Sequence, residues 1–418
     1  MVPPPPTTLT NLPGQLPPFD PGLSARAVID LDAIAANTRA LRAAAPSAGV
    51  IAVVKADGYG HGLVPSARAA LAGGATWLGV AQAGEALALR AAGITSQQAR
   101  ILAWLYALGV DFQPLIEADV DLTVAAPWSL DAIATAARGA GRLARVHLGV
   151  DTGLGRNGLM PDMLSKIARR AAALEAEGVL QVVGVWSHLA YADEPGHPTI
   201  RAQRNVFEAA CLTLEAAGIW PEVRHLANSA ATLTAPELHY DLVRPGLSLY
   251  GYSPVPSEAP SSAFELKPAM TLQARLATVK PARAGHGVSY SHRYVTSGPT
   301  TLGVVPLGYA DGIPRHASGD AETCAPGGPV LVGAGTTSVR VVRVAGRVCM
   351  DQFVLDLGPD AAEQVGDVVT LWGASDGLGH GSEMPNAEDW AAAAGTISYE
   401  IFTRLGPRVP RVYVGVGA

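Results

Sequence analysis

Short apolar runs recur through roughly the first 250 residues and alternate with segments of helical periodicity. Most runs are almost continuously apolar, which is typical of parallel strands buried on both faces of a sheet. The eight runs are 50–54, 77–80, 101–105, 122–125, 143–150, 182–186, 223–226 and 242–243. Helical segments are expected at 66–71, 85–92, 129–138, 163–177 and 201–217. This number and rhythm of elements favours a (β/α)8 TIM barrel over the alternative, a doubly wound open sheet.

The pattern changes near residues 253–268, where proline and serine are frequent and a linker is expected. After it, β-like runs dominate, and glycine clusters separate several of them. These runs are 272–279, 301–306, 329–331, 338–344, 368–371 and 412–416, and 373–386 resembles a surface loop. We therefore expect a disordered proline-rich leader at 1–22, a barrel at 23–258 and a mostly β C-terminal domain at 259–418.

Composition narrows the class of protein. The 418 residues carry 30 basic and 36 acidic side chains, and this net charge of −6 argues against a nucleic-acid partner. No apolar run is long enough to span a membrane. The 3 cysteines form no disulfide framework or zinc spacing, and no metal is expected. The first twenty residues lack the positive charge and apolar run of a signal peptide, so a cytoplasmic protein is expected.

Lysine is scarce, which limits the candidates for any reaction that needs a nucleophilic amine. The chain has four lysines, Lys55, Lys166, Lys267 and Lys280, and arginine cannot replace them because it stays protonated. Lys55 ends the apolar run 50–54, where burial would favour the free amine and a Schiff base with a carbonyl cofactor such as pyridoxal phosphate. A lysine that extends to a solvent-exposed rim is equally consistent with this position.

The ends of the other predicted strands also carry polar side chains, and in TIM barrels these ends form the active site. They supply Asp151, Arg156, His188, His225, Asn228, Ser229 and Arg244. The Ser229 hydroxyl and the backbone amides of Gly246 and Leu247 would suit a phosphate group. Residues 153–158 match G-x-G-x-x-G, but we reject a dinucleotide site because this motif belongs in a Rossmann unit.

Three segments of the predicted β domain interrupt its apolar pattern and contain Tyr290, Tyr309 and Met350. Alone, each of these residues would be a strand or core residue. Together with the barrel motifs they resemble the alanine racemase family, pyridoxal-phosphate-dependent enzymes built from a (β/α)8 barrel and a β domain. The resemblance covers 27–413, and its motifs lie at 29–34, 52–62, 150–156, 228–230, 243–246, 288–290, 308–312, 349–352 and 398–400.

The resemblance implies a two-base mechanism. Lys55 would carry the cofactor and act as the base on the D-alanine side, and Tyr290 would be the base on the L-alanine side. In the family this tyrosine comes from the partner subunit, which implies a homodimer with shared active sites. His188 and Arg244 would form a hydrogen-bonded network around the tyrosine, with His225 supporting Arg244.

The resemblance also implies the binding residues. Besides Lys55, the cofactor would contact Tyr59, His188, Asn228, Ser229, Arg244, Gly246, Leu247 and Tyr399. The substrate carboxylate would meet Arg156 and the Met350 amide, with Asp351 in a supporting role. Tyr309 and Tyr399 would narrow the entrance to fit a small side chain, and alanine is the implied substrate.

One position departs from the family pattern. Many members carry a carbamylated lysine before the Val-Asp-Thr-Gly motif, where it orients the arginine, but here that position is Gly149. We therefore expect activity that does not depend on bicarbonate and that responds to chloride, a candidate acceptor for Arg156. The chain also looks longer than the family pattern around 315–328, and no role is assigned to that insertion.

The implied function is interconversion of L-alanine and D-alanine, which would supply D-alanine for peptidoglycan precursors. A racemase of broader specificity, for example toward serine, is an alternative that rates across an amino-acid panel would separate. A decarboxylase of the same plan would release carbon dioxide, and the set Tyr290, Tyr309 and 349–351 argues against it. A non-enzymatic pyridoxal phosphate carrier would resemble the barrel alone, whereas this chain has a β domain with an apparent second base.

Overall fold

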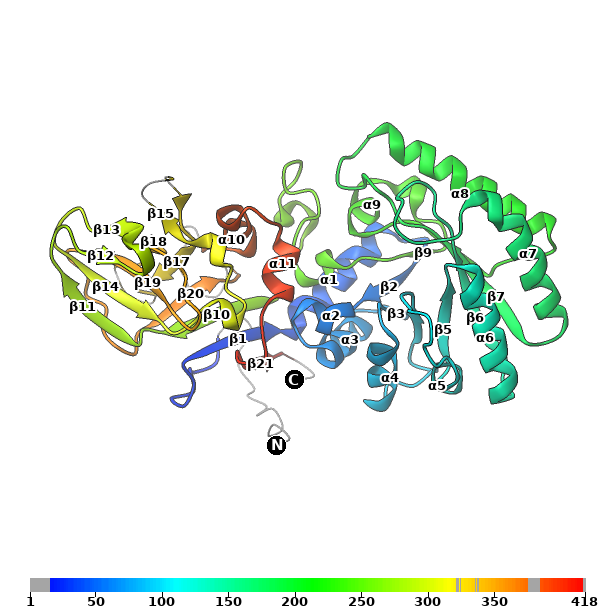
Figure 1. Ribbon diagram of the computed structural model, residues 1–418, viewed down its shortest axis with the longest axis horizontal. Coiled ribbons are helices and arrows are strands. Elements are labelled where there is room, and N and C mark those ends of the chain that lie inside the picture. The colour runs from blue at the N-terminus through cyan, green and yellow to red at the C-terminus, as the bar shows by residue number, and fades with distance from the viewer. Residues whose placement is uncertain are drawn as a thin grey trace. The chain divides into compact units, whose positions relative to one another are not determined.

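The computed structural model describes residues 16–320, 323, 325–334, 336, 338–374 and 384–415 (Figure 1). The chain divides into two compact units. The barrel unit comprises Ala33–Gly58 and Ser66–Lys267. The β unit comprises the described residues of Met1–Asp32, Tyr59–Pro65 and Pro268–Ala418.

The barrel unit is built on one sheet of 8 strands in the order β8-β7-β6-β5-β4-β3-β2-β9, all paired in parallel. The strands are β2 (Gly49–Val53), β3 (Trp77–Val80), β4 (Arg100–Ala103), β5 (Val120–Val124), β6 (Ala144–Gly149), β7 (Leu180–Trp186), β8 (Val223–His225) and β9 (Leu242–Val243). A parallel bridge between Asn228 and Arg244 follows β8 and β9 and nearly closes the sheet. The expectation of a (β/α)8 barrel is confirmed.

Helices lie between these strands, as the alternating pattern predicts. They are α1 (Leu31–Ala44), α2 (Lys55–Tyr59), α3 (Leu63–Ala72), α4 (Ala83–Ala91), α5 (Gln113–Glu117), α6 (Pro127–Ala140), α7 (Pro161–Ala176), α8 (Pro198–Ala216) and α9 (Ser229–Thr234). In α7 the buried residues Leu164, Ile167, Ala168, Ala171 and Leu174 recur every three or four positions, so one face of the helix is apolar. The sequence pattern did not indicate α1, α2 or α5.

The β unit contains a 6-stranded sheet in the order β18-β17-β20-β10-β1-β21 and a 3-stranded sheet in the order β11-β14-β19. The larger sheet consists of β1 (Ala25–Asp30), β10 (Met270–Arg275), β17 (Pro329–Val332), β18 (Arg340–Arg343), β20 (Val368–Trp372) and β21 (Arg411–Val414). The smaller consists of β11 (Thr278–Ala282), β14 (Thr300–Val305) and β19 (Phe353–Gly358). Two short hairpins, β12 (Gly287–Val288) with β13 (Tyr294–Val295) and β15 (Gly319–Asp320) with β16 (Ala325–Pro326), and helices α10 (Ala387–Ala394) and α11 (Ser398–Thr403) complete it.

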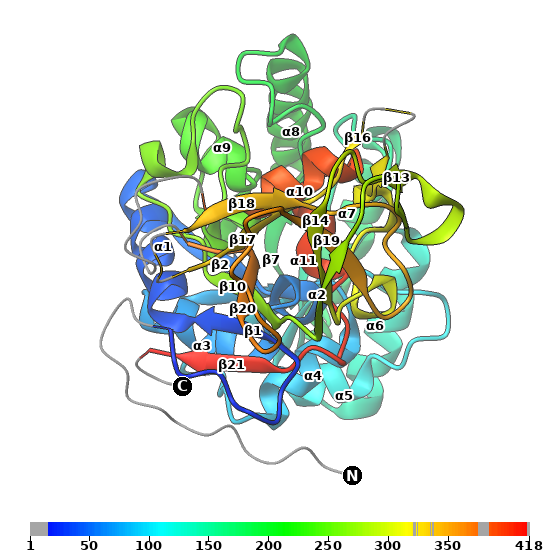
Figure 2. The same ribbon diagram turned by 90° about the vertical axis from the view of Figure 1, so that its left-hand side faces the viewer.

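Strand β1 differs from its expected place. The expected boundary at residue 23 put it in the barrel, but it pairs antiparallel with β10 and parallel with β21 (Figure 2). Its first five residues, Ala25–Ile29, are all buried, and a short buried run of this kind does not indicate which sheet it joins. The sequence alone therefore misplaces this strand.

Part of the expected leader is packed against the same strand. The buried Arg26 guanidinium donates hydrogen bonds to the carbonyl oxygens of Pro17 and Pro18 at 2.7 and 2.8 Å and lies over the Phe19 ring at 4.5 Å. These contacts are a correction to the expectation of disorder as far as residue 22. The expected leader up to residue 15 and positions 375–383 of the expected loop lie outside the described residues.

Two further findings concern the described residues as a whole. None of their helices is long and apolar enough to cross a membrane. Nor does this part of the chain contain a group of three or more His, Cys, Asp or Glu side chains arranged to hold a metal ion.

Candidate active site

Lys55 lies two residues after the end of β2, and an unusual turn positions it. The residues after it, Ala56 and Asp57, have φ values of 54° and 53°, a left-handed conformation that is costly for residues other than glycine. Glu85 of α4 stabilises this turn because its Oε1 accepts a hydrogen bond from the Ala56 amide at 2.6 Å. Its Oε2 accepts from the amides of Ala81 and Gln82, both at 3.0 Å. The lysine loop is thus tied to the turn between β3 and α4.

The surroundings of Lys55 favour its neutral amine. Burial is the largest cause that lowers its pKa, and the positive charge of Arg156 lowers it further, whereas Glu85 acts in the opposite direction. Its Nζ lies 5.8 Å from the centroid of the Trp104 ring. Lys55 is therefore partly buried in the structure, and its role stays a prediction.

Arg244 is buried at the end of β9 and is held by several acceptors. Its Nη1 lies 3.1 Å from Nδ1 of His225, and its Nη2 donates to the carbonyl oxygen of Ser187 at 2.6 Å. Nη2 also lies 3.5 Å from Nδ1 of His188. The guanidinium carbon is 4.9 Å from the centroid of the Trp186 ring. Burial lowers the pKa of Arg244 to about 9, so the group stays charged at neutral pH.

The two histidines beside Arg244 are held in their neutral form. Burial, then the charges of Arg244, Arg156 and Lys55, lower the pKa of His188 to about 3. Burial and then the charge of Arg244 lower the pKa of His225 well below its usual value. Each imidazole therefore has one ring nitrogen that donates and one that accepts.

Asn228 and Ser229 form the start of α9. Asn228 caps this helix because its side-chain oxygen accepts a hydrogen bond from the Ala231 amide at 3.1 Å. The Ser229 hydroxyl oxygen accepts from the Gly246 amide at 2.8 Å. The sequence expectation gave both of these groups, with the Leu247 amide, to a phosphate. In this structure Ser229 and Gly246 instead bind each other.

Arg156 lies in an exposed turn that glycines make possible. The Asp151 carboxylate accepts hydrogen bonds from the amides of Gly153 and Gly155 at 2.9 and 3.1 Å. Gly158 has a φ of 132°, and a Cβ there would lie 2.5 Å from the Asp151 nitrogen, so only glycine fits. The turn thus presents the Arg156 side chain to solvent at the end of the fifth barrel strand in sequence, β6.

The space beside Gly149 is taken by an indole ring. A Cβ at position 149 would lie 3.2 Å from Nε1 of Trp186 and 3.3 Å from Cγ2 of Thr123. Both Nε1 of Trp186 and Oγ1 of Thr123 are buried without a hydrogen-bond partner among the described residues. Gly149 therefore lies beside an indole and two buried polar atoms that have no partner among the described residues.

Tyr290 is 69% exposed and lies in a strained turn of the β unit. Its neighbours Ser289, Ser291 and His292 have φ values of 61°, 61° and 47°. The Ser289 hydroxyl donates to the Arg347 carbonyl oxygen at 2.8 Å, which fixes the turn to the segment that leads to Met350. The side chain of Tyr290 thus projects from a defined backbone.

Tyr309 and Met350 are held together through their backbones. The amides of Tyr309 and Ala310 donate to the carbonyl oxygens of Cys349 and Met350, both at 3.0 Å. A Cβ on Gly308 would overlap the Met350 carbonyl oxygen, so this close approach needs glycine. Tyr309 is 39% exposed and Met350 53%, so both present their side chains outward.

Sequence reasoning missed Arg408, which connects the expected residue Asp351 to the Tyr309 turn. Its Nη1 lies 2.8 Å from Asp351 and its Nε 2.9 Å from the buried Asp311. No motif marks an arginine so far along the chain. The remaining expected residues of the β unit, Tyr59 and Tyr399, have ring centroids 6.1 Å apart, and burial raises the pKa of Tyr59.

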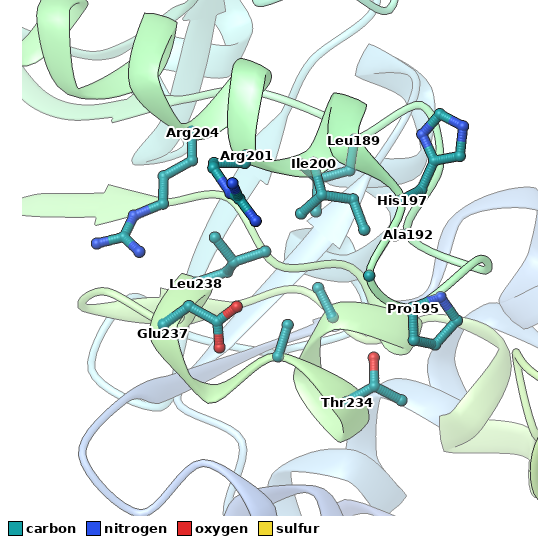
Figure 3. Close-up of a pocket in the computed structure, with 13 residues that line it drawn as sticks. Leu189, Ala192, Pro195, His197, Ile200, Arg201, Arg204, Thr234, Glu237 and Leu238 are labelled. Atoms are coloured by element: carbon teal, nitrogen blue, oxygen red, sulfur yellow. The ribbon is translucent and has the colours of Figure 1, made fainter.

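A cavity of about 170 Å³ lies elsewhere in the barrel unit, between the loop after β7, the start of α8 and the segment after α9 (Figure 3). Its apolar lining includes Leu189, Ile200 and Leu238, and Arg201 and Glu237 are among its charged residues. None of the expected site residues lines it.

The expected site residues thus fall into two sets, one on each unit. Lys55, Arg156, His188, His225, Asn228, Ser229, Arg244, Gly246 and Leu247 belong to the barrel unit. Tyr59, Tyr290, Tyr309, Met350, Asp351 and Tyr399 belong to the β unit. A parallel barrel with a partly buried lysine, neutral histidines and a buried arginine at its strand ends, joined to a β domain with exposed tyrosines, defines a barrel enzyme of two parts.

Comparison with known proteins identifies the family. Residues 29–254 match the model of the alanine racemase N-terminal domain, and residues 269–413 match that of the C-terminal domain. The alanine racemase of Frankia casuarinae is 56% identical over 388 residues, which cover 93% of this chain and 96% of that protein. That of Streptomyces coelicolor is 54% identical over 398 residues, which cover 94% and 97%.

The solved structures that resemble this chain are also alanine racemases. The crystal structure of alanine racemase from Streptomyces lavendulae superposes with a TM-score of 0.88 at 53% identity and covers 95% of this chain and 98% of that one. The Bacillus anthracis enzyme with bound L-Ala-P gives a TM-score of 0.83 at 34% identity, covering 96% and 97%. The chain belongs to the alanine racemase family, and it is an isomerase.

Proposed function

We propose that this chain interconverts L-alanine and D-alanine with pyridoxal phosphate as cofactor. The observation that carries the proposal is the place of Lys55, a partly buried amine just after a barrel strand, whose pKa is lowered by burial and by Arg156. Family membership supports the reaction. The cofactor, the roles of individual residues and the supply of D-alanine for peptidoglycan in the cytoplasm are inferences from the resemblance.

The donor set of the barrel unit fits pyridoxal phosphate. Lys55 offers the amine that an aldehyde requires, and Arg244 offers a buried cation whose orientation several acceptors fix. Asn228 and Ser229 lie at the start of α9, and Ser229 and Leu247 are buried beside Gly246. When bound, the cofactor supplies an electron-withdrawing ring that acidifies the α-proton of an amino acid.

In this proposal Arg244 would donate a hydrogen bond to the ring nitrogen of the cofactor and keep its own proton. Its pKa of about 9 remains above neutral pH. His225 and the Ser187 carbonyl oxygen fix the orientation of the guanidinium. His188 is neutral, so it can both accept from Arg244 and donate to another group.

Two bases are needed, because racemisation removes a proton from one face of the α-carbon and returns it to the other. Lys55 acts on one side, and its lowered pKa makes the free amine available. We assign the other side to Tyr290, which is 69% exposed on the β unit and therefore available to a second copy of the chain. Arg156 and the Met350 amide bind the substrate carboxylate in this scheme.

A side-chain pocket narrowed by Tyr309 and Tyr399 would select alanine by size. Such selection is worth about 1–3 kcal/mol per methylene group, so slower turnover of serine is expected. A racemase that prefers serine is the second candidate, and rates across an amino-acid panel decide between the two. Release of carbon dioxide from any amino acid would instead indicate a decarboxylase.

The direct test is purified protein with pyridoxal phosphate and each alanine enantiomer, followed by chiral chromatography. Tyr290→Phe removes the proposed base and is expected to slow racemisation at least about 100-fold. Tyr294→Phe is the matched control, because Tyr294 lies four positions further on and binds Asp356 at 2.6 Å. Full racemisation in both directions by Tyr290→Phe would overturn the assignment.

Shared active sites have their own test. Lys55→Ala and Tyr290→Phe each inactivate both sites of a homodimer, but a mixed dimer of the two variants contains one site with an intact lysine and an intact tyrosine. After unfolding and refolding together, random pairing is expected to restore about a quarter of the wild-type activity. No recovery, with mixed dimers verified by mass spectrometry, would place both residues in one subunit's site.

A further inference from the structure

Three buried side chains extend from Arg244 through the interior of the barrel. Nδ1 of His225 lies 3.1 Å from Arg244, and its Nε2 lies 2.9 Å from Nδ1 of His147 on β6. Nε2 of His147 in turn lies 3.5 Å from Oδ2 of Asp121 on β5. Asp121, His147 and His225, here called the interior column, are each 0% exposed. Sequence analysis marked only His225.

The two ends of the interior column determine where its protons lie. Arg244 can only donate, so Nδ1 of His225 must accept. A neutral His225 then carries its proton on Nε2 and donates it to Nδ1 of His147. Because Nδ1 of His147 accepts, a neutral His147 carries its proton on Nε2, which lies 3.5 Å from the Asp121 carboxylate, an ion-pair distance and not a regular hydrogen bond. All hydrogens therefore point in the same direction, from Arg244 toward Asp121.

The charges around the column keep this arrangement. Burial lowers the pKa of His147, and burial with the charge of Arg244 lowers that of His225, so both imidazoles are neutral. Burial alone would raise the pKa of Asp121, but His147, Arg100 and Arg145 outweigh it and leave a lowered pKa. Arg100 and Arg145 lie 2.7 and 2.5 Å from its two oxygens. A buried carboxylate thus forms a fixed end.

Neighbouring residues of the barrel pack closely against the two imidazole rings of the interior column. Gly184 of β7 lies so close to the His147 ring that a Cβ at this position would overlap it. Trp77 packs its edge against His147 with centroids 5.4 Å apart. Trp186 is stacked on His225, with centroids 5.9 Å apart and an interplanar angle of 3°. Neither imidazole can turn over without displacing a neighbour.

We propose that Asp121 and His147 are positioning residues for the reaction: by fixing the tautomer of His225 they keep its Nδ1 lone pair on Arg244 and hold the guanidinium in one orientation. The effect on the reaction rests on the proposed function, in which Arg244 would hold the cofactor. The tautomers of His147 and His225 are a property of the protein alone and do not depend on that function. The two parts are therefore tested separately.

The tautomers are tested by NMR on protein labelled with 15N-histidine and prepared without cofactor, since nitrogen chemical shifts distinguish protonated from unprotonated ring nitrogens. His147 and His225 are expected to be neutral and protonated on Nε2 at pH 7. Asp121→Asn removes the fixed acceptor at one end and leaves Arg244 alone to hold the arrangement. It is therefore expected to add a minor population of the Nδ1-protonated tautomers of both histidines, because an amide donates as readily as it accepts. A wild-type His225 that is cationic or protonated on Nδ1 would overturn the proposal.

Asp119→Asn is the matched control. Asp119 shares Arg145 with Asp121, at 3.5 Å, but does not contact His147. Its φ of 55° is one that asparagine tolerates. The control should therefore keep both wild-type tautomers. Equal mixing in the Asp119→Asn and Asp121→Asn variants would show that general loss of charge, and not the column, sets the tautomers.

Position 147 provides a rescue test. Asparagine can place an oxygen near the former Nδ1 and accept from His225, whereas leucine cannot. His147→Leu is expected to mix the tautomers of His225 and to lower kcat about tenfold or more, with the KM for alanine changed less than about twofold. His147→Asn should restore most of both. The positioning role would be refuted if His147→Leu had the same kcat and the same His225 tautomer as the wild type. If the wild type showed the expected tautomers but no racemase activity, only the proposed function would be refuted.

Discussion

Because His188 is neutral in the folded chain, the free energy of unfolding should fall as the pH is lowered. Substitution of His188 should remove this part of the pH dependence. The pKa of His188 is about 3 in the folded chain, compared with an ordinary value of 6.5. Between these two values the unfolded chain binds a proton that the folded chain does not. The contribution of the neutral His188 to the free energy of unfolding is therefore fully present above about pH 6.5. It is lost as the pH falls toward 3.

Over much of this pH range, the size of the effect depends only on how far His188 is protonated in the unfolded chain. At pH 5.5 the folded His188 remains neutral, while about nine in ten unfolded molecules carry the proton. Lowering the pH from 7.5 to 5.5 should therefore raise the unfolding equilibrium constant about tenfold through this residue, which corresponds to roughly 1 to 2 kcal/mol.

The assay is urea unfolding of cofactor-free wild type and His188→Asn at both pH values. The variant should lose less stability between pH 7.5 and 5.5 by roughly 1 to 2 kcal/mol, since His147 and His225 remain in both proteins and their effects cancel. Equal pH dependence in the two proteins would refute the reasoning, because it would mean that His188 is protonated in the folded chain or has an ordinary pKa.

Three further outcomes are expected. Lys55→Ala should abolish the covalent cofactor absorbance, while arginine at each of the other three lysine positions should leave it intact, as visible spectra of the purified variants would reveal. Because position 149 is glycine, activity should be unaffected by bicarbonate but should rise with chloride after thorough dialysis; a flat chloride titration would count against the ion. Gly308→Ala should cost about 1–3 kcal/mol in urea unfolding because its Cβ overlaps the Met350 carbonyl oxygen, whereas Gly298→Ala, with nothing within 4 Å, should be nearly neutral.

The barrel was predictable because its strands are short apolar runs. Most of the polar residues that lie together in the barrel unit could be found because they directly follow such runs in the sequence. Lys55, His188 and Arg244 could be found because each ends such a run. His147 lies inside a run, where a histidine gives no signal of its own. Its alignment with Asp121 and His225 depends on register, and the pairing of β6 with β7 shifts between Val146 and His147. A linear pattern does not contain that shift.

Other parts escaped for different reasons. Strand β1 is buried like a barrel strand, and only its partners β10 and β21 show where it belongs. Arg408 lies 57 positions from Asp351, and the ion pair between them requires the fold. Trp186 directly precedes Ser187 and His188 at the end of a predicted strand, so the rule that found His188 could also have found it.

The indole beside Gly149 also limits the order in which substitutions at this site can be made. A side chain at position 149 would bring its Cβ within 3.2 Å of Trp186, so the indole must shift by a few tenths of an ångström to admit it. Replacing Trp186 first would leave a void next to Gly149 and remove the ring on which Arg244 lies. The effect of a substitution at position 149 should therefore depend on which residue occupies position 186, so the two positions are expected to form an epistatic pair.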